Sequence, residues 1–266
     1  MKILITGHQG FIGQNMMEAL SSEHEVDGLE WNDALPNLLG YDWVIHLGAI
    51  TSTTEHDVEK VMEYNYDFSR YLLIECEKAG VNLQYASSAS VYGTYREFKE
   101  DSLKFPKSPY AWSKYLFDRF FEKFAEQGRW NKIKVQGFRY FNVYGPYEDH
   151  KGEQASPFHK FTTQAKETGV IKLFEGSDRF FRDFIHVNDV VDIHKKFLKI
   201  NKSGIFNVGT GKPRSFEDVA KEIAAQHNAT IEYVPMLDNL KNQYQEFTCA
   251  DLTHLEDTLN DVENHS

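Results

Sequence analysis

The chain has 266 residues, a formal net charge of −11, 41% hydrophobic residues and 26% charged residues. This length and balance suit a globular protein with one large domain and a smaller lobe. The acidic charge and the lack of a dense Lys/Arg run argue against a nucleic-acid partner, and no apolar run approaches the roughly 20 residues that cross a membrane. Two cysteines are too few for a disulfide scaffold, and Met1–Thr6 already has a strand pattern, so we expect a cytoplasmic protein without a leader peptide.

The first part of the chain alternates strand patterns with helix patterns. Short apolar runs that end at glycine or polar residues predict five strands: Lys2–Thr6, His24–Glu30, Asp42–Leu47, Asn82–Ala86 and Lys132–Tyr140. Apolar residues at helical spacing predict three helices: Phe11–Leu20, Glu55–Lys78 and Ser108–Glu126. This alternation predicts an α/β fold, with a Rossmann-type doubly wound parallel sheet in a dinucleotide-binding domain over residues 1–145.

The pattern changes after about residue 142, where loops lengthen and glycines scatter. Three short strands are expected, at Ile171–Phe174, Gly204–Val208 and Thr230–Val234. Two helices are expected between them, at Asn188–Ile200 and Ser215–Gln226. We expect residues 146–266 to form mainly a smaller substrate-binding lobe over the carboxyl edge of the sheet, with later segments returning to the first domain.

A glycine motif, G-x-x-G-x-x-G, joins the first strand to the first helix through Gly7, Gly10 and Gly13. Glycines allow a tight turn and let a pyrophosphate approach the helix N-terminus. The alternative is a tight turn that binds no ligand, but the strand before it and the helix after it favour a dinucleotide site. The end of the third strand has the same two interpretations, because its backbone can approach a cofactor or the strand can simply stop there: Leu47, Gly48 and Ala49.

Glu30 ends the second expected strand, where a carboxylate can accept hydrogen bonds from the adenosine ribose hydroxyls. An ordinary solvated glutamate at a strand end is the alternative. Between Leu29 and Ile45 the chain has no Lys or Arg, and a ribose 2′-phosphate usually requires such a cation. The local chemistry therefore favours NAD over NADP.

Tyr110 and Lys114 form a Y-x-x-x-K pair on the third expected helix. Positions i and i+4 share a helix face, so the ammonium can lie beside the phenol, lower its pKa and also hold the nicotinamide ribose. Ser88, in a run of serines after a strand, can hydrogen-bond a substrate oxygen. An exposed helix pair and a polar turn are the ordinary alternatives. In combination with the glycine motif, we interpret the three residues as a catalytic set.

The glycine turn, SSASVYG and YAWSK resemble the extended short-chain dehydrogenases, which include sugar-nucleotide epimerases and dehydratases. Longer stretches resemble the ADP-glyceromanno-heptose 6-epimerases within that family, and they are GFRYFNVYGPYEDHKGEQAS, KLFEGSDRFFRDF, FNVGTG and LKNQYQEFTCADLT. The resemblance implies inversion of carbon 6 of an ADP-linked heptose used for lipopolysaccharide. It also implies that the sugar is oxidised to a 6-keto intermediate, turns in the site and takes hydride back on the other face.

The resemblance also implies roles for particular residues. It selects Ser88 among the serines, and it makes Lys151 the second acid/base group, although its surroundings in the sequence alone suggest a surface lysine. Substrate contacts are implied at Asn142, His159, Phe174, Glu175, Gly176, Ser177, Arg182 and Tyr244. Further cofactor contacts are implied at Phe11, Ile12, Asn65 and Val143. Phe174 and Val143 can equally be core residues, and Tyr244 a packed aromatic residue.

Several alternatives stay open. The resemblance implies NADP, whereas the short segment after Glu30 favours NAD, so the cofactor is NADP or NAD. Another sugar-nucleotide epimerase or dehydratase is possible on this scaffold, but SSASVYG lacks the Asp-Glu pair of a dehydratase. A non-catalytic dinucleotide-binding regulator would not need the catalytic set. The 11 histidines show no metal-ligand spacing, and we assign His186 and His194 to a helix face. We expect a homo-oligomer.

Overall fold

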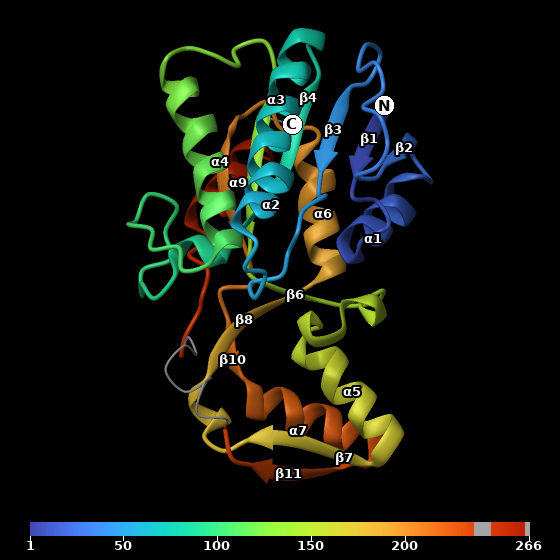
Figure 1. Cartoon of the computed structure of the whole chain (residues 1–266), viewed down its shortest axis with the longest axis vertical. Coiled ribbons are helices and arrows are strands. Elements are labelled where there is room, and N and C mark those ends of the chain that lie inside the picture. The colour runs from blue at the N-terminus through green and yellow to red at the C-terminus, as the bar shows by residue number, and fades with distance from the viewer. Residues whose placement is uncertain (237–245, 264–266) are drawn as a thin grey trace.

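A six-stranded parallel sheet lies at the centre of the larger part of the molecule (Figure 1). The computed structural model describes residues 1–236 and 246–263, with side chains up to residue 261. The strands lie in the order β2 (Glu25–Leu29), β1 (Lys2–Thr6), β3 (Trp43–His46), β4 (Asn82–Ser88), β5 (Val135–Tyr140) and β9 (Gly204–Val208). Every neighbouring pair is parallel. The expected Rossmann-type α/β fold is confirmed.

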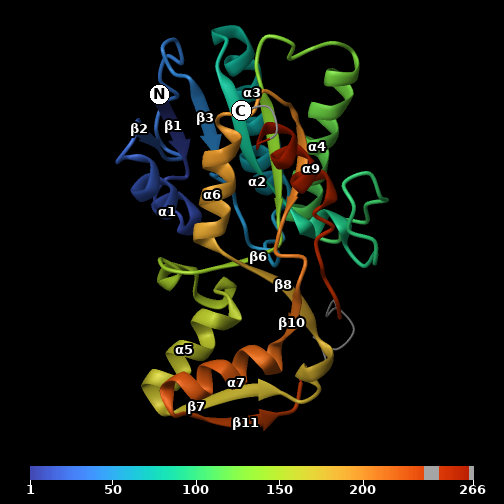
Figure 2. The same cartoon turned by 180° about the vertical axis from the view of Figure 1, so that it is seen from behind.

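Helices cover both faces of this sheet. On the face turned towards the viewer in Figure 1 lie α2 (Val58–Met62), α3 (Phe68–Ala79) and α4 (Pro109–Glu126). On the opposite face, seen in Figure 2, lie α6 (Val187–Phe197) and α9 (Thr253–Glu263). The helix α1 (Phe11–Leu20) packs against α6. The central strands β1, β3 and β5 are therefore largely buried.

The smaller lobe lies beyond the carboxyl edge of the sheet. It contains a three-stranded sheet of β10 (Pro213–Ser215), β8 (Phe181–His186) and β6 (Asn142–Tyr144), and a pair of β11 (Thr230–Val234) and β7 (Val170–Phe174). Its helices α5 (Pro157–Thr168) and α7 (Phe216–His227) pack on each other. The strand β9 and the helix α6 also follow residue 142 but lie with the six-stranded sheet, because β9 pairs with β5.

The helix expected over Glu55–Lys78 is interrupted. It begins at Val58, after Asp57 caps it, and a π-helical turn over Glu63–Asp67 separates α2 from α3. Asn65 lies inside that turn, is 1% exposed, and bonds both backbone groups of Ile50 at 2.8 and 2.9 Å. Such turns are frequent at functional sites. An asparagine that bonds a distant loop leaves no trace in the apolar periodicity, so the sequence predicts one continuous helix.

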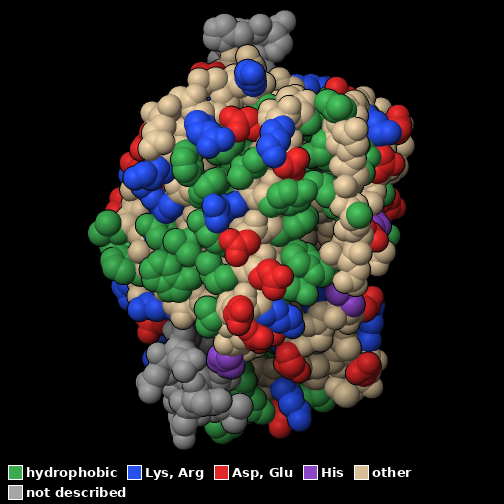
Figure 3. Space-filling model, turned by 45° about the horizontal axis from the view of Figure 1, so that its top comes forward, with side chains coloured by type: hydrophobic (Ala, Val, Ile, Leu, Met, Phe, Trp, Pro, Cys, Tyr) green, Lys and Arg blue, Asp and Glu red, His purple; other side chains and the backbone are tan. Residues whose placement is uncertain are grey.

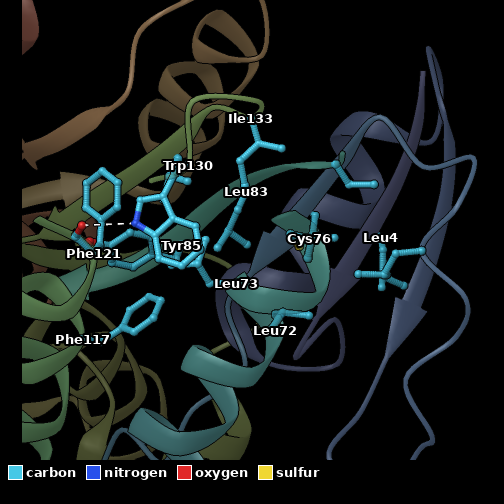
Figure 4. Close-up of a cluster of buried hydrophobic side chains, with 14 of the residues drawn as sticks. Leu4, Leu72, Leu73, Cys76, Leu83, Tyr85, Phe117, Phe121, Trp130 and Ile133 are labelled. Carbon is cyan, nitrogen blue, oxygen red and sulfur yellow. Dashed lines mark hydrogen bonds between the residues drawn. The ribbon is translucent and has the colours of Figure 1, made fainter. Parts of the chain in front are cut away.

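A large apolar cluster lies between the sheet and the helices α3 and α4 (Figure 4). Leu72, Leu83 and Phe117 are among its buried side chains. Trp130 closes one end, and its indole N–H donates to the carbonyl oxygen of Phe121 at 3.4 Å. Burial of a side chain of this size stabilises the fold by about 1.5–3 kcal/mol. The cluster holds α4 against the sheet.

A buried ion pair lies beneath α4. The Asp118 carboxylate accepts hydrogen bonds from Tyr85 at 3.0 Å, Ser87 at 2.9 Å and the Arg139 guanidinium at 2.9 Å. The exposed fractions of the Asp118 and Arg139 side chains are 0% and 1%. These contacts join α4 to β4 and β5, so they fix the helix that carries Tyr110 relative to the strand that carries Ser88.

The surface mixes charges of both signs. On the face shown in Figure 3, Lys and Arg side chains lie among Asp and Glu side chains. In residues 1–236 and 246–263, no helix combines the length and the apolar character needed to cross a membrane.

We predict that Asp118→Asn destabilises the protein strongly. The change leaves the Arg139 guanidinium buried without a counter-charge, which costs roughly 3–5 kcal/mol. Urea denaturation measures the loss. Arg119→Gln is the matched control, because it removes an exposed ion pair with Glu122. The exposed fractions of the Arg119 and Glu122 side chains are 50% and 30%, so this change should leave the midpoint almost unchanged. Similar midpoints for the two variants would contradict the prediction.

Candidate active site

A cavity of about 720 Å³ lies at the carboxyl edge of the six-stranded sheet. Its walls come from the ends of β1, β3, β4 and β5, from α4 and from the loop that leads into the smaller lobe. Four of the residues that line it were predicted as catalytic: Ser88, Tyr110, Lys114 and Lys151. The strand order reverses between β1 and β3, and ligands bind at such switch points in α/β folds.

The glycine turn forms the floor of this cavity. Gly7 has a φ of +68°, and a Cβ on it would lie 2.5 Å from the Cα of Gly48, so only glycine lets the ends of β1 and β3 approach. A Cβ on Gly13 would lie 2.1 Å from the carbonyl oxygen of Gly7. Gly10 precedes α1, and no side chain of the described residues caps that helix. The first amides of α1 therefore remain donors beside the cavity, which suits a pyrophosphate group.

The Glu30 carboxylate lines the same cavity. It accepts a hydrogen bond from the Gln9 amide at 2.8 Å and lies 3.1 Å from Nδ1 of His8. Its side chain is 32% exposed, so it can also accept hydrogen bonds from a ligand. With the glycine turn, this carboxylate makes the cavity fit for a nicotinamide dinucleotide.

An aromatic wall beside Glu30 was missed by the sequence analysis. Trp31 stacks on Tyr64 with ring centroids 3.6 Å apart and planes at 17°, and Phe68 meets the Trp31 ring edge-on at 5.2 Å. All three rings line the cavity. The sequence could have indicated Trp31 as a wall residue, because it directly follows Glu30, which was predicted to contact the cofactor. The other two rings come from the π-helical turn and the start of α3, and only the fold brings them here.

Ser88 on β4 and Lys114 on α4 both line the cavity. Ser88 ends β4, and its hydroxyl accepts a hydrogen bond from the Ser90 amide at 3.1 Å. Lys114 is 5% exposed, and its ammonium donates to the carbonyl oxygen of Ala86 at 2.7 Å. The Lys114 nitrogen lies 6.0 Å from the centroid of the Tyr110 ring. The structure therefore brings the three residues together, as the sequence analysis expected.

Burial is the largest influence on the pKa values of Tyr110 and Lys114. It raises the pKa of Tyr110, and interaction with the Ser88 hydroxyl lowers that pKa only in part. This direction is opposite to the one expected from the neighbouring lysine, because the desolvation of a phenolate outweighs a cation several ångströms away. Burial also lowers the pKa of Lys114 to about 8, with Asp118 acting in the other direction.

Lys151 lines the cavity, although its neighbours in the loop are exposed. It is part of a 3-10 turn over Asp149–Gln154, and its ammonium lies 3.1 Å from a carboxylate oxygen of Glu148. The same nitrogen lies 4.6 Å from the centre of the Phe11 ring, at the start of α1. Its side chain is 21% exposed. The Glu148 carboxylate was not singled out in the sequence, although it lies three residues before Lys151.

The remaining residues predicted to contact cofactor or substrate lie either in the lining of the cavity or outside it. Most predicted cofactor residues, together with Asn142, line the cavity: Phe11, Ile12, Leu47, Gly48, Ala49 and Val143. Asn65 lies behind the wall and bonds Ile50 and Ser113. The other substrate candidates that the structure describes lie in the smaller lobe, outside the lining of this cavity: His159, Phe174, Glu175, Gly176, Ser177 and Arg182. Tyr244 lies outside the described residues.

Two histidines assigned to a helix face have separate local partners. His186 precedes α6 and accepts a hydrogen bond from the Asn188 amide. His194 is fully buried, and its ring bonds Gln84 at 2.7 Å and the Tyr140 hydroxyl, which lines the cavity, at 2.5 Å. In the part of the chain that the structure describes, no group of three or more His, Cys, Asp or Glu residues could hold a metal ion.

The fold is similar to solved nucleotide-sugar enzymes. ADP-L-glycero-D-manno-heptose-6-epimerase of Helicobacter pylori matches with a TM-score of 0.86 and 26% identity, over 97% of this chain and 90% of that one. UDP-glucose 4-epimerase of Thermus thermophilus in complex with NAD matches with 0.80 and 26%, over 97% and 92%. An NAD-dependent NDP-hexosamine 5,6-dehydratase involved in tunicamycin biosynthesis matches with 0.80 and 26%, over 97% and 91%.

A family model also matches the sequence directly. The match covers residues 3–209, which include the glycine turn, the catalytic candidates and the first half of the smaller lobe. It covers more than half of the chain. The protein belongs to the NAD dependent epimerase/dehydratase family.

Proposed function

We propose that the protein is a nucleotide-sugar epimerase that inverts carbon 6 of an ADP-linked heptose. The observation that carries this proposal is the position of Ser88, Tyr110, Lys114 and Lys151 around one cavity with the glycine turn. Two proton-handling groups suit an inversion, because the sugar presents its oxygen in two orientations. The sequence resemblance and the similarity to the heptose epimerase of H. pylori support the choice of sugar.

In the proposed reaction, the C–H bond at carbon 6 breaks as the hydroxyl becomes a ketone, and a new C–H bond then forms on the opposite face. A bound nicotinamide dinucleotide supplies the hydride acceptor and donor. In one direction, Tyr110 takes the hydroxyl proton as the ketone forms, and Ser88 hydrogen-bonds the same oxygen. Lys114 supplies a nearby cation that favours the phenolate form of Tyr110. Lys151, as the ammonium, gives a proton to the oxygen on the other face as hydride returns, and Tyr110 and Lys151 then regain their starting protonation states by exchange with water.

We propose NAD as the cofactor. Glu30 is placed to bond the adenosine ribose hydroxyls, and its negative charge opposes a 2′-phosphate. His8 is the nearest cationic candidate, but it is charged only when protonated and already faces Glu30 at 3.1 Å. The segment between Leu29 and Ile45 contains no Lys or Arg.

A second candidate is another reaction on a different nucleotide sugar. The UDP-glucose 4-epimerase and the hexosamine dehydratase match this chain at the same 26% identity as the heptose epimerase. Of the sugar and nucleotide residues implied by the heptose resemblance, Asn142 lines the cavity, but others, including His159 and Arg182, do not. A panel of nucleotide sugars therefore belongs in the first activity assay.

We predict that Tyr110→Phe and Lys151→Met each abolish the inversion but preserve different half-reactions. The loss in turnover should be about 10²–10⁴-fold, as for other acid–base groups. A substrate analogue with an aldehyde at carbon 6 allows hydride exchange between two molecules without inversion, and each variant should retain exchange on one face. Chiral product analysis measures this. Normal inversion in Lys151→Met would leave Tyr110 to serve both faces alone.

We predict that Lys114→Met lowers turnover and changes how stability depends on pH. Between about pH 8 and 10.5 the unfolded chain keeps a proton on Lys114 that the folded protein has lost, so this residue makes stability rise with pH. The rise amounts to at most about 3 kcal/mol and should be missing from the variant. Urea denaturation at pH 7.5, 9 and 10.5 compares the two proteins. Parallel pH curves would contradict the assignment.

We predict that denaturation of freshly purified protein releases NAD. Mass spectrometry of the released nucleotide identifies it. Titration with both cofactors, followed by tryptophan fluorescence, should show tighter binding of NAD than of NADP. Glu30→Ala combined with Asn32→Arg should reverse this order, because it replaces a carboxylate with a cation for the 2′-phosphate. Tighter binding of NADP by the unmodified protein would overturn the proposed role of Glu30.

A further inference from the structure

One buried carboxylate organises the loop that carries Lys151. Glu148 is 1% exposed, although it lies in a loop between β6 and α5. Its two oxygens accept hydrogen bonds from the Gly145 amide at 3.1 Å, the Ser156 amide at 2.7 Å and the Ser156 hydroxyl at 2.7 Å. The fourth donor is the Lys151 ammonium at 3.1 Å. Glu148 therefore connects both ends of the loop to the lysine in its middle.

The carboxylate is ionised in these surroundings. Burial raises the pKa of Glu148, but the hydrogen bonds from Ser156 and the positive charge of Lys151 outweigh burial, so that the pKa lies below its ordinary value. An ionised buried carboxylate is costly unless donors and an opposite charge satisfy it. Three neutral donors and one cation meet that requirement here.

Lys151 is held between this carboxylate and the cofactor side of the cavity. Its ammonium lies over the Phe11 ring at 4.6 Å, next to the first turn of α1. Gly152 follows it with a φ of +50°, which a glycine adopts without strain. Lys151 and Ser156 line the cavity, whereas Glu148 lies behind them. The carboxylate can thus act on a bound ligand through Lys151 or Ser156.

Most other charged groups around this loop pair with residues other than Lys151. On α1, Glu18 accepts a hydrogen bond from the Tyr147 hydroxyl at 3.1 Å. On α5, His159 lies 3.8 Å from Asp149, and Lys160 lies 3.2 Å from Glu153. From the start of α6, His186 borders Gly145. From α4 and the loop itself, Tyr110, Lys114 and His150 line the same cavity as Lys151. Glu148 is the charged group that pairs with Lys151.

We propose that Glu148 is the positioning residue that holds Lys151 in the cavity and controls when its amine carries a proton. The contribution to catalysis rests on the proposed function, but the control of the amine does not. A carboxylate that pairs with the ammonium opposes loss of its proton, so the lysine can release the proton only when a ligand or a conformational change weakens the pair. Lys151 then acts as a cation towards an incoming anionic group before it acts as a base.

The first test needs no substrate. Lysine side chains are methylated with ¹³C-formaldehyde, and the Lys151 signal is identified by its loss in Lys151→Arg. In Glu148→Gln this signal should titrate at lower pH than in the wild type, because the opposite charge 3.1 Å from the ammonium is removed. Glu153→Gln is the matched control, because this carboxylate lies in the same loop but is 97% exposed and pairs with Lys160.

An unchanged Lys151 midpoint in Glu148→Gln would overturn the proposal. If Glu148→Gln does not fold, Glu148→Asp tests the same point. Its shorter carboxylate retracts from the ammonium, so the Lys151 signal should shift in the same direction by a smaller amount. Circular dichroism and the thermal midpoint report folding. No shift in a folded Glu148→Asp would also overturn the proposal.

The second test uses the reaction. In Glu148→Gln the Lys151-dependent half-reaction should reach its plateau at lower pH than in the wild type, whereas the Tyr110-dependent half-reaction keeps its profile. A purely structural role for Glu148 would lower the rate equally at every pH, and that result would overturn the proposal. If the wild type and Glu153→Gln turn over no nucleotide sugar, the proposed function fails, and the titration still decides the role of Glu148.

Discussion

The geometry of the active site depends on a buried ion pair beneath it. Asp118 lies one helical turn after Lys114, and its carboxylate binds Arg139 of β5 together with hydroxyl groups from β4. A charge pair that is fully removed from water stabilises only in a well-fitted arrangement, so it tolerates little displacement of α4. Ser88 at the end of β4 and Tyr110 on α4 are therefore held in a fixed relation, which a hydroxyl–phenol pair requires.

Contacts near the carboxyl edge of the sheet explain why glycine occurs at positions 7 and 48 and asparagine at position 65. Gly7 and Gly48 bring the ends of β1 and β3 into direct contact, which opens the cavity above them at the switch point. Asn65 holds the backbone of Ile50 and also bonds Ser113 of α4. The floor of the cavity and the helix α4 are thus connected through one buried amide.

The loop that carries Lys151 is held in a different way, by one buried carboxylate. Its position is determined by one carboxylate, Glu148, that satisfies donors from both ends of the loop. Such a loop can be held in place with little regular secondary structure, because several of its hydrogen bonds converge on a single charged group. The smaller lobe contributes its own core between α5 and α7, while the larger domain and this loop supply the groups that surround the cavity.

Local patterns were sufficient to determine the alternation of strands and helices, the glycine turn and the Tyr110–Lys114 pair, because each depends on neighbouring positions along one element. Contacts between distant segments were decided by the tertiary structure alone. The stack of Trp31 on Tyr64, the burial that raises the pKa of Tyr110, and the enclosure of Lys151 by Glu148 all arise from desolvation and packing across elements. Periodicity in a sequence reports which face of an element is apolar, but it does not report which other element will cover that face.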